Sequence, residues 1–232
     1  MSRRRRPYVT VFVTMSADGK IASVVRDSRL SCPFDKRRQH ALRASHDAVV
    51  VGASTVLIDN PLLTVRLVKA PNPKRVIIDG KLRIPLNAHV VTNKDAETII
   101  LTCSDNERFE KITALREASV KVLTFPCVNG IIDLSEALLK LKDEGISSIL
   151  VEGGGELLWH FFKLSLVDEF RVTLSPYIIG GRDAVTPVGG QGFGTFSEWV
   201  KLRLVHVIRC ECGNEVHLVY RVLKRSNAHD TI

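Results

Sequence analysis

Short apolar runs alternate with helix-forming segments along the first two-thirds of this 232-residue chain. Ala48–Gly52 and Ser148–Glu152 are almost entirely apolar, which is typical of strands covered on both faces. Asp133–Glu144 carries leucine and alanine at three- and four-residue steps, which predicts an amphipathic helix capped by Asp133 or its neighbour. Strands joined by helices imply right-handed crossovers and a mostly parallel sheet, so the expected fold class is α/β. Further strands are expected at Tyr8–Met15, Arg75–Asp79, Thr98–Thr102 and Lys121–Thr124, and further helices at Pro33–Ser45, Asn106–Ala118 and Glu156–Lys163.

The last third of the chain has a different pattern. Glu169–Leu174, Leu202–Arg209 and Glu215–Leu223 are longer and alternate apolar with polar residues, which is typical of antiparallel strands. No low-complexity linker or internal repeat divides the chain. We therefore expect one domain over residues 7–223, preceded by a basic arm at 1–6 and followed by a tail at 224–232.

The charge distribution favours a small anionic ligand. Lysine and arginine (33) exceed aspartate and glutamate (25), which gives a net charge of +8, and four of the positive charges are Arg3–Arg6. A basic arm can contact nucleic acid or a membrane surface. Aromatic residues make up only 6% of the chain, however, and do not interleave with basic ones as in base-stacking surfaces. We expect a solvated arm, with neither nucleic acid nor membrane as a partner.

Hydrophobic residues make up 45% of the chain, enough to bury a large core. No apolar run approaches the ~20 residues that a membrane-spanning helix needs. The N-terminal segment also lacks the apolar stretch and cleavage site of a secretory signal. The expected location is the cytoplasm.

The five cysteines are few and scattered. An odd number at irregular spacing does not indicate a disulfide framework. Cys210 and Cys212 form a C-x-C pair that lacks the second pair or the flanking histidines of a zinc site. The sequence therefore predicts reduced thiols and no metal.

Several loops that follow predicted strands carry residues suited to a ligand. In an open α/β sheet such loops build the binding crevice. Glu152 ends a buried strand and is followed by Gly153-Gly154-Gly155, where the backbone can approach a ligand closely and free N–H groups can attract phosphate. The alternative is a tight strand-to-helix turn, but a carboxylate at the buried end of an apolar strand is costly without a polar task.

Two more loops have the same character. Thr55 and Asp59 are four residues apart on one face of a short helical turn, where they could hold a ribose or an amide, and Arg66 further on could bind phosphate. A capped turn is the alternative. Gly80, Lys81 and Arg83 follow another strand and suit the 2′-phosphate of NADP, although a solvated basic loop would look the same.

Taken in order, these segments resemble the riboflavin-biosynthesis pyrimidine reductases. This family includes the reductase half of the bacterial deaminase-reductase and the stand-alone archaeal and fungal enzymes. The matching stretches are Met15–Lys20 (MSADGK), Asp27–Ser31 (DSRLS), Leu42–Ala44 (LRA), Val51–Arg66, Ile78–Gly80 (IDG), Val151–Gly155 (VEGGG) and Pro176–Gly181 (PYIIGG). The resemblance covers residues 7–223.

The resemblance implies a dihydrofolate-reductase-like fold, NADPH as hydride donor and a homodimer. It also implies reduction of a ribosylamino-pyrimidine 5′-phosphate at C1′ of the ring-opened imine, which gives the ribitylamino product. Gly80 departs from the serine of relatives, which leaves a 2′-phosphate contact to the backbone or to Lys81 and Arg83. Residues expected by the resemblance to face the cofactor are Met15, Thr55, Asp59, Gly80, Gly153, Gly154 and Gly155, and those expected to face the substrate are Asp27 or Ser28, Arg43, Leu63, Arg66 and Glu152.

The chemistry needs a proton as well as a hydride. Asp59 and Glu152 are the two carboxylates expected near both ligands, and either could act as general acid or only bind hydroxyls. We prefer Asp59 for the proton, and Arg43 with Arg66 for the 5′-phosphate.

A missing motif bears on which substrate the resemblance implies. The H-x-E and P-C-x-x-C signature of zinc deaminases does not occur in the sequence. Without that motif the chain resembles the stand-alone reductases of the archaeal and fungal type, which implies the 2,5-diamino-pyrimidinone as the expected substrate. The alternatives are the deaminated 5-amino-uracil substrate, or a non-catalytic NADP- or nucleotide-binding module.

Overall fold

The computed structural model describes residues 6–105 and 109–224. Five residues of the predicted arm and all but the first residue of the predicted tail lie outside the described residues. The chain forms two compact units. The first comprises residues 1–8 and 36–154, and the second comprises residues 9–35 and 155–232. None of the described helices is long and apolar enough to cross a membrane.

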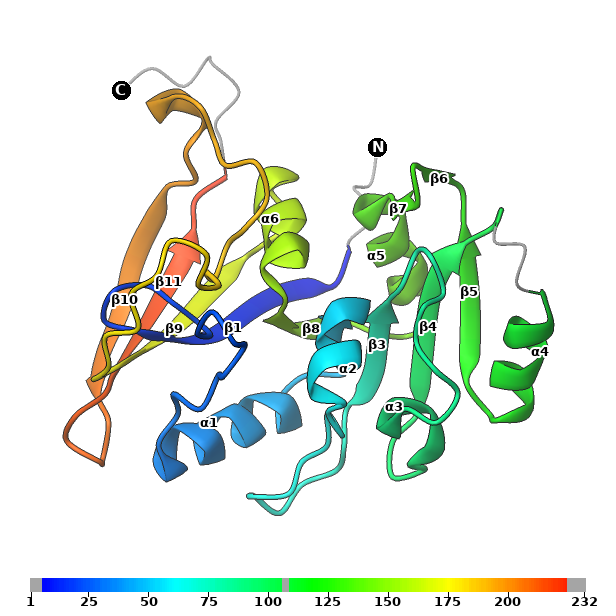
Figure 1. Ribbon diagram of the computed structural model, residues 1–232, viewed down its shortest axis with the longest axis horizontal. Coiled ribbons are helices and arrows are strands. Elements are labelled where there is room, and N and C mark those ends of the chain that lie inside the picture. Colours follow the sequence, from blue (N-terminus) through cyan, green and yellow to red (C-terminus); the bar gives the residue numbers. More distant parts are fainter. Residues whose placement is uncertain (1–5, 106–108, 225–232) are drawn as a thin grey trace. The chain divides into compact units, whose positions relative to one another are not determined.

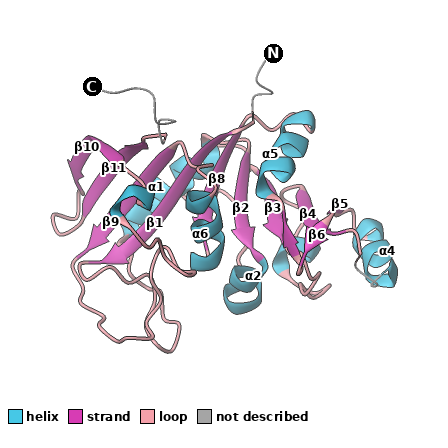
Figure 2. Ribbon diagram, turned by 90° about the horizontal axis from the view of Figure 1, so that it is seen from above, coloured by secondary structure: helices cyan, strands magenta, loops and turns pink. Residues whose placement is uncertain are grey.

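The first unit contains five parallel strands in the order β8-β2-β3-β4-β5 (Figure 1; β2 is labelled in Figure 2). Each strand coincides with an apolar run in the sequence, so the predicted parallel strands are confirmed. The strands are β2 (Ala48–Gly52), β3 (Lys74–Ile78), β4 (Thr98–Cys103), β5 (Lys121–Phe125) and β8 (Ser148–Gly153).

Helices and a small hairpin complete this unit. The amphipathic pattern predicted one of them closely: Asp133 accepts hydrogen bonds from the Ser135 and Glu136 N–H groups, and the helix buries its leucine face. The elements are most of α1 (Pro33–Ala44), α2 (Ala53–Asp59), α3 (His89–Thr92), α4 (Phe109–Glu117), α5 (Leu134–Asp143), and the hairpin of β6 (Cys127–Val128) and β7 (Ile131–Ile132).

The second unit contains four strands in the order β10-β11-β9-β1 (Figure 2). The strand β1 (Tyr8–Ser16) pairs in parallel with β9 (Glu169–Ser175). The strands β11 (Val216–Val222) and β10 (Leu202–Arg209) add antiparallel, which confirms the prediction for the C-terminal third. The helices of this unit are α6 (Gly155–Lys163) and the 3-10 turn η1 (Phe196–Glu198).

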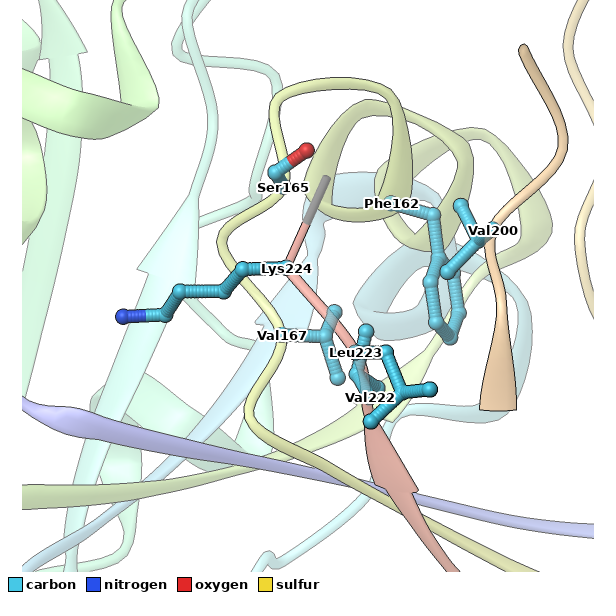
Figure 3. A pocket seen from close by; sticks show the side chains of 7 residues that line it. All are labelled: Phe162, Ser165, Val167, Val200, Val222, Leu223 and Lys224. Carbon is cyan, nitrogen blue, oxygen red and sulfur yellow. The ribbon is translucent and has the colours of Figure 1, made fainter. Parts of the chain in front are cut away.

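A small cavity lies at the end of α6 in the second unit. It is lined mainly by apolar side chains, among them Phe162, Val167 and Val222 (Figure 3). Its volume of about 10 Å³ is that of a single water molecule, so it is a packing defect rather than a ligand site.

The prediction of five reduced thiols is wrong for one pair. Cys103 and Cys127 form a disulfide with their Cα atoms 5.5 Å apart. The cause is strand pairing: Cys103 at the end of β4 lies opposite Phe125 of β5, and Cys127 follows two residues later. Spacing along the chain does not reveal such a pair. Cys32, Cys210 and Cys212 are free thiols.

Candidate functional site

A buried ion pair joins α1 to the carboxyl end of β8. Arg43 in the last turn of α1 donates from Nε and Nη2 to the two oxygens of Glu152, each at 2.7 Å. The two side chains are only 8% and 6% exposed. Burial disfavours the cation, but the Glu152 carboxylate outweighs it and raises the pKa of Arg43. A planar fork of this kind fixes the carboxylate in one orientation.

Two more contacts complete the surroundings of this pair. Gln39 donates to Glu152 at 3.0 Å, and Arg43 Nη1 donates to the Thr64 carbonyl oxygen at 3.0 Å. One guanidinium therefore holds a helix, a strand end and the loop after α2 together. The predicted substrate residues Arg43 and Glu152 are thus bound to each other.

The loop after α2 carries a second basic group. Arg66 is exposed, and its Nη1 donates to the Thr64 hydroxyl at 2.8 Å. Its backbone N–H donates to Nδ1 of His40 at 2.8 Å. Burial, followed by the positive charges of Arg43 and Arg66, lowers the pKa of His40 to about 4. His40 is therefore a neutral acceptor at physiological pH, and Arg66 is the exposed cation of this group.

The side chain of Leu63 points into the protein core, so a ligand could meet only its backbone. Its side chain is buried in the apolar core of the first unit. Its φ of +54° is uncommon for a residue with a Cβ and is held by its surroundings. Buried Arg75 supports this segment by donating to the Leu62 carbonyl oxygen and to Asn93.

The glycine turn after Glu152 lies against α2. The φ of Gly153 is +128°, a conformation open to glycine. The Gly154 N–H donates to the Thr55 hydroxyl at 3.3 Å. Thr55 and Asp59 occupy one face of α2, as the spacing predicted. Asp59 is exposed, yet partial burial by the surrounding chain raises the pKa of its carboxyl.

The loop after β3 explains the glycine at position 80. A Cβ there would lie 2.1 Å from the Gly130 carbonyl oxygen, so a serine does not fit without a backbone shift. Buried Asp79 accepts from the Ile84 N–H at 2.8 Å and shapes the loop. Arg83 donates to the Ser54 hydroxyl at 3.3 Å, next to Thr55. Lys81 and Arg83 are exposed cations.

The second unit holds the remaining predicted residues. Met15 is the penultimate residue of β1 and pairs with Leu174, and its carbonyl oxygen accepts from the Ser175 hydroxyl at 3.1 Å. Asp27 binds the Arg29 guanidinium, which lowers the pKa of its carboxyl to about 2. Ser28 next to it is exposed. Gly155 begins α6, and a Cβ there would lie 3.0 Å from the Thr186 carbonyl oxygen.

Sequence reasoning missed Gln39, His40 and Arg75. A signal existed for the first two: they precede Arg43 by four and three residues, so one face of α1 presents all three side chains. Arg75 gave no signal, because arginine at the start of an apolar run reads as a solvated strand end.

The model of the RibD C-terminal domain family matches residues 7–218 of the chain. The chain belongs to this family. It spans about half the length of one relative, riboflavin biosynthesis protein RibD of Actinobacillus pleuropneumoniae, with 37% identity over 202 residues, 86% of this chain and 53% of that protein. A second relative is the 2,5-diamino-6-ribosylamino-4(3H)-pyrimidinone 5′-phosphate reductase of Aquifex aeolicus. It is 37% identical over 212 residues, which cover 88% of this chain and 92% of the relative.

Solved structures agree with this assignment. RibD of Acinetobacter baumannii superposes with a TM-score of 0.81 at 25% identity, over 96% of this chain and 59% of that one. Dihydrofolate reductase of Enterococcus faecalis matches with a TM-score of 0.53 at 12% identity, over 95% and 99% of the two chains, and shows a shared fold alone. The expected dihydrofolate-reductase-like α/β fold of the RibD C-terminal domain is thus confirmed.

The neutral state of His40 predicts an acid-sensitive fold. The pKa is 6.5 in the ordinary case and about 4 here, so between these values the unfolded chain binds the proton more readily. The contribution of His40 to the free energy of unfolding is therefore fully present above pH 6.5. It is lost as the pH drops toward 4, by on the order of 2–3 kcal/mol. We expect His40→Gln, which keeps an acceptor, to flatten urea-unfolding stability over this range. The matched change at exposed His89, His89→Gln, should leave the slope intact. Equal slopes for the parent and His40→Gln would contradict this account.

Proposed function

We propose that this chain reduces the ribosylamino group of 2,5-diamino-6-ribosylamino-4(3H)-pyrimidinone 5′-phosphate with NADPH, in riboflavin biosynthesis. Membership of the RibD C-terminal domain family and the activity for which the Aquifex relative is named support the reaction class. The observation that carries it in this chain is the buried Arg43–Glu152 pair. It holds a carboxylate in one orientation beside a glycine turn.

The residues of the first unit fit NADPH. Gly153 and Gly154 offer a backbone without side chains, and Thr55 and Asp59 lie on the adjoining face of α2. Exposed Lys81 and Arg83 suit a 2′-phosphate, since a serine does not fit at position 80. When bound, NADPH supplies the hydride for C1′ of the substrate. Assignments of Met15, Asp27, Ser28 and Gly155 stay predictions from the resemblance.

The two carboxylates have different roles in this proposal. Both oxygens of Glu152 are engaged by Arg43 and Gln39, which suits a carboxylate that accepts from substrate hydroxyls. Asp59 is exposed, and its raised pKa moves it toward the range where a carboxylic acid can donate a proton. We therefore assign proton delivery for imine formation and reduction to Asp59, directly or through water.

The two arginines also divide. Arg43 is committed to Glu152 and Thr64, so it acts as a positioning residue. Arg66 is exposed and keeps guanidinium donors beyond the one bound to Thr64. His40 beside it is neutral at physiological pH and adds no positive charge of its own. Arg66 is therefore assigned to the 5′-phosphate.

Removing Arg66 tests the phosphate assignment. In an NADPH-oxidation assay we expect Arg66→Ala to raise KM for the diamino substrate by about 10- to 100-fold, the loss of one or two charge-assisted hydrogen bonds, with kcat little changed. Lys69→Ala, at another exposed cation of the same loop, is the matched control and should behave as the parent. The same KM in both variants would remove Arg66 from the site.

The same assay tests the function itself. The parent should oxidise NADPH with the diamino-pyrimidinone phosphate in preference to the deaminated 5-amino-uracil phosphate. Preference for the uracil would replace the substrate in the proposal. No turnover of either compound would favour the non-catalytic module.

The edge strand β10 supports a homodimer. All eight of its residues are exposed, including Leu204, Val205, Val207 and Ile208. Among the described strands it pairs with β11 alone. An exposed apolar edge is a ready template for another chain, and a second copy of this strand would cover it. The proposed location of this activity is the cytoplasm.

An acidic residue on β10 should separate the two copies. We expect the parent to sediment at twice the mass of one chain and Val207→Asp at the mass of one chain, because an aspartate would be buried without a partner. Val128→Asp, at an exposed valine of β6, controls for the charge change and should remain dimeric. A parent that sediments as a single chain would rule out the homodimer.

A further inference from the structure

A cluster of three thiols and a carboxylate lies in the second unit, at the turn between β10 and β11. The turn supplies Cys210, Cys212 and Glu215, and Cys32 comes from the residue before α1. The four ligand atoms all lie within 4.8 Å of one another. The sequence reasoning assigned no partner to the C-x-C pair, but the fold brings one from 178 residues away.

The distance between two of the sulfur atoms is that of ligands around one ion, and the carboxylate lies within hydrogen-bond distance of one of them. Sγ of Cys32 lies 3.7 Å from Sγ of Cys210 and 3.0 Å from a carboxylate oxygen of Glu215. Four tetrahedral ligands on zinc, with Zn–S bonds of about 2.3 Å, place neighbouring sulfur atoms roughly 3.8 Å apart. All three cysteines are free thiols.

The turn is shaped to present these ligands. The Cys210 N–H donates to the Glu215 carbonyl oxygen at 2.9 Å, and the Gly213 N–H donates to the Cys210 carbonyl oxygen at 2.9 Å. Gly213 has a φ of +80°, which allows the chain to reverse between Cys212 and Glu215. The thiols of the C-x-C pair therefore lie on a fixed hairpin turn rather than on a loose loop.

The carboxylate of the cluster is buried and lacks a basic side chain as a partner among the described residues. Glu215 is 2% exposed and Cys210 is 4% exposed. Within the described part of the chain, no lysine or arginine forms an ion pair with Glu215; its carboxylate accepts from the Cys32 N–H at 2.8 Å. The Asp35 N–H donates to the Cys32 sulfur at 3.4 Å. A buried carboxylate among thiols calls for a cation, and the two N–H groups orient its ligands.

We propose that Cys32, Cys210, Cys212 and Glu215 bind one structural zinc ion. Thiolates select zinc over the hard cations magnesium and calcium, and a four-ligand set closes the coordination shell, as in structural sites. Binding releases the thiol protons to solvent and changes no oxidation state. The ion ties the residue before α1 to the β10–β11 turn.

The segment that this ion secures is otherwise held by a buried aspartate. Asp35, in the first turn of α1, accepts from the hydroxyls of Thr14 at 2.7 Å and Thr173 at 2.6 Å. Zinc at Cys32 would fix the chain three residues before Asp35. Cys32 follows Asp27 and Ser28 by five and four residues in the sequence. The site is independent of the proposed reduction, since none of its ligands is assigned to substrate or cofactor.

Metal content and cobalt spectroscopy of the full chain test this proposal. The chain, produced with zinc and purified anaerobically without chelator, should retain zinc in a one-to-one ratio through desalting. Cobalt exchanged into the site should show tetrahedral d–d bands and the charge-transfer intensity of three thiolates. These two measurements on the unaltered chain decide the proposal even if a ligand variant does not fold.

Matched variants assign the ligands. Cys212→Ser and Glu215→Gln should each lower zinc affinity by at least about 10-fold, as the loss of even an orienting contact does at such sites. Glu211→Gln, at the exposed glutamate within the C-x-C pair, and Cys127→Ser, in the disulfide, should bind zinc as the parent does.

Three results would overturn the proposal. The first is a parent chain that neither retains zinc nor gives thiolate bands with cobalt. The second is a disulfide among Cys32, Cys210 and Cys212 in the anaerobically purified chain. The third is zinc binding that survives in Cys212→Ser and Glu215→Gln alike, which would mark an adventitious surface ion.

Discussion

The ion pair between Arg43 and Glu152 is the interaction on which the candidate site of the first unit depends. It joins the last turn of α1 to the end of β8, and the same guanidinium holds the Thr64 carbonyl oxygen. Leaving either charge buried alone typically costs about 3–5 kcal/mol, so the partners are retained together. The pair thereby sets the position of the Thr64–Arg66 segment and the orientation of the carboxylate at once.

The proposed division of roles rests on this constraint. Because Arg43 is committed to Glu152, we propose the exposed Arg66 as the group that meets the phosphate of the substrate. Because Glu152 is engaged on both oxygens, Asp59, with its raised pKa, is better suited to exchange a proton. Gly80 shows a similar constraint in the backbone: the Gly130 carbonyl oxygen excludes a side chain at this position, which is why we propose Lys81 and Arg83 for the phosphate contact.

Sequence patterns predicted the strands, the helix capped by Asp133 and the antiparallel C-terminal third, because burial and capping leave local periodic traces. They also placed Thr55 beside the glycine turn, since strand ends of a parallel sheet meet at one edge. They did not reveal the Cys103–Cys127 disulfide or the approach of Cys32 to Glu215. Those contacts come from strand pairing and chain reversal between distant residues, which leave no periodic trace. Gln39 and His40 could have been predicted, because they lie four and three residues before Arg43 on the same helix.

The most direct test of this account is the reaction of Glu152→Gln, a change that keeps the shape of the side chain and removes its charge. With the fold verified by circular dichroism, turnover of the diamino-pyrimidinone phosphate should fall by about 100-fold or more, whereas NADPH affinity measured by fluorescence stays near that of the parent. Full turnover in this variant would contradict the central role given to the Arg43–Glu152 pair.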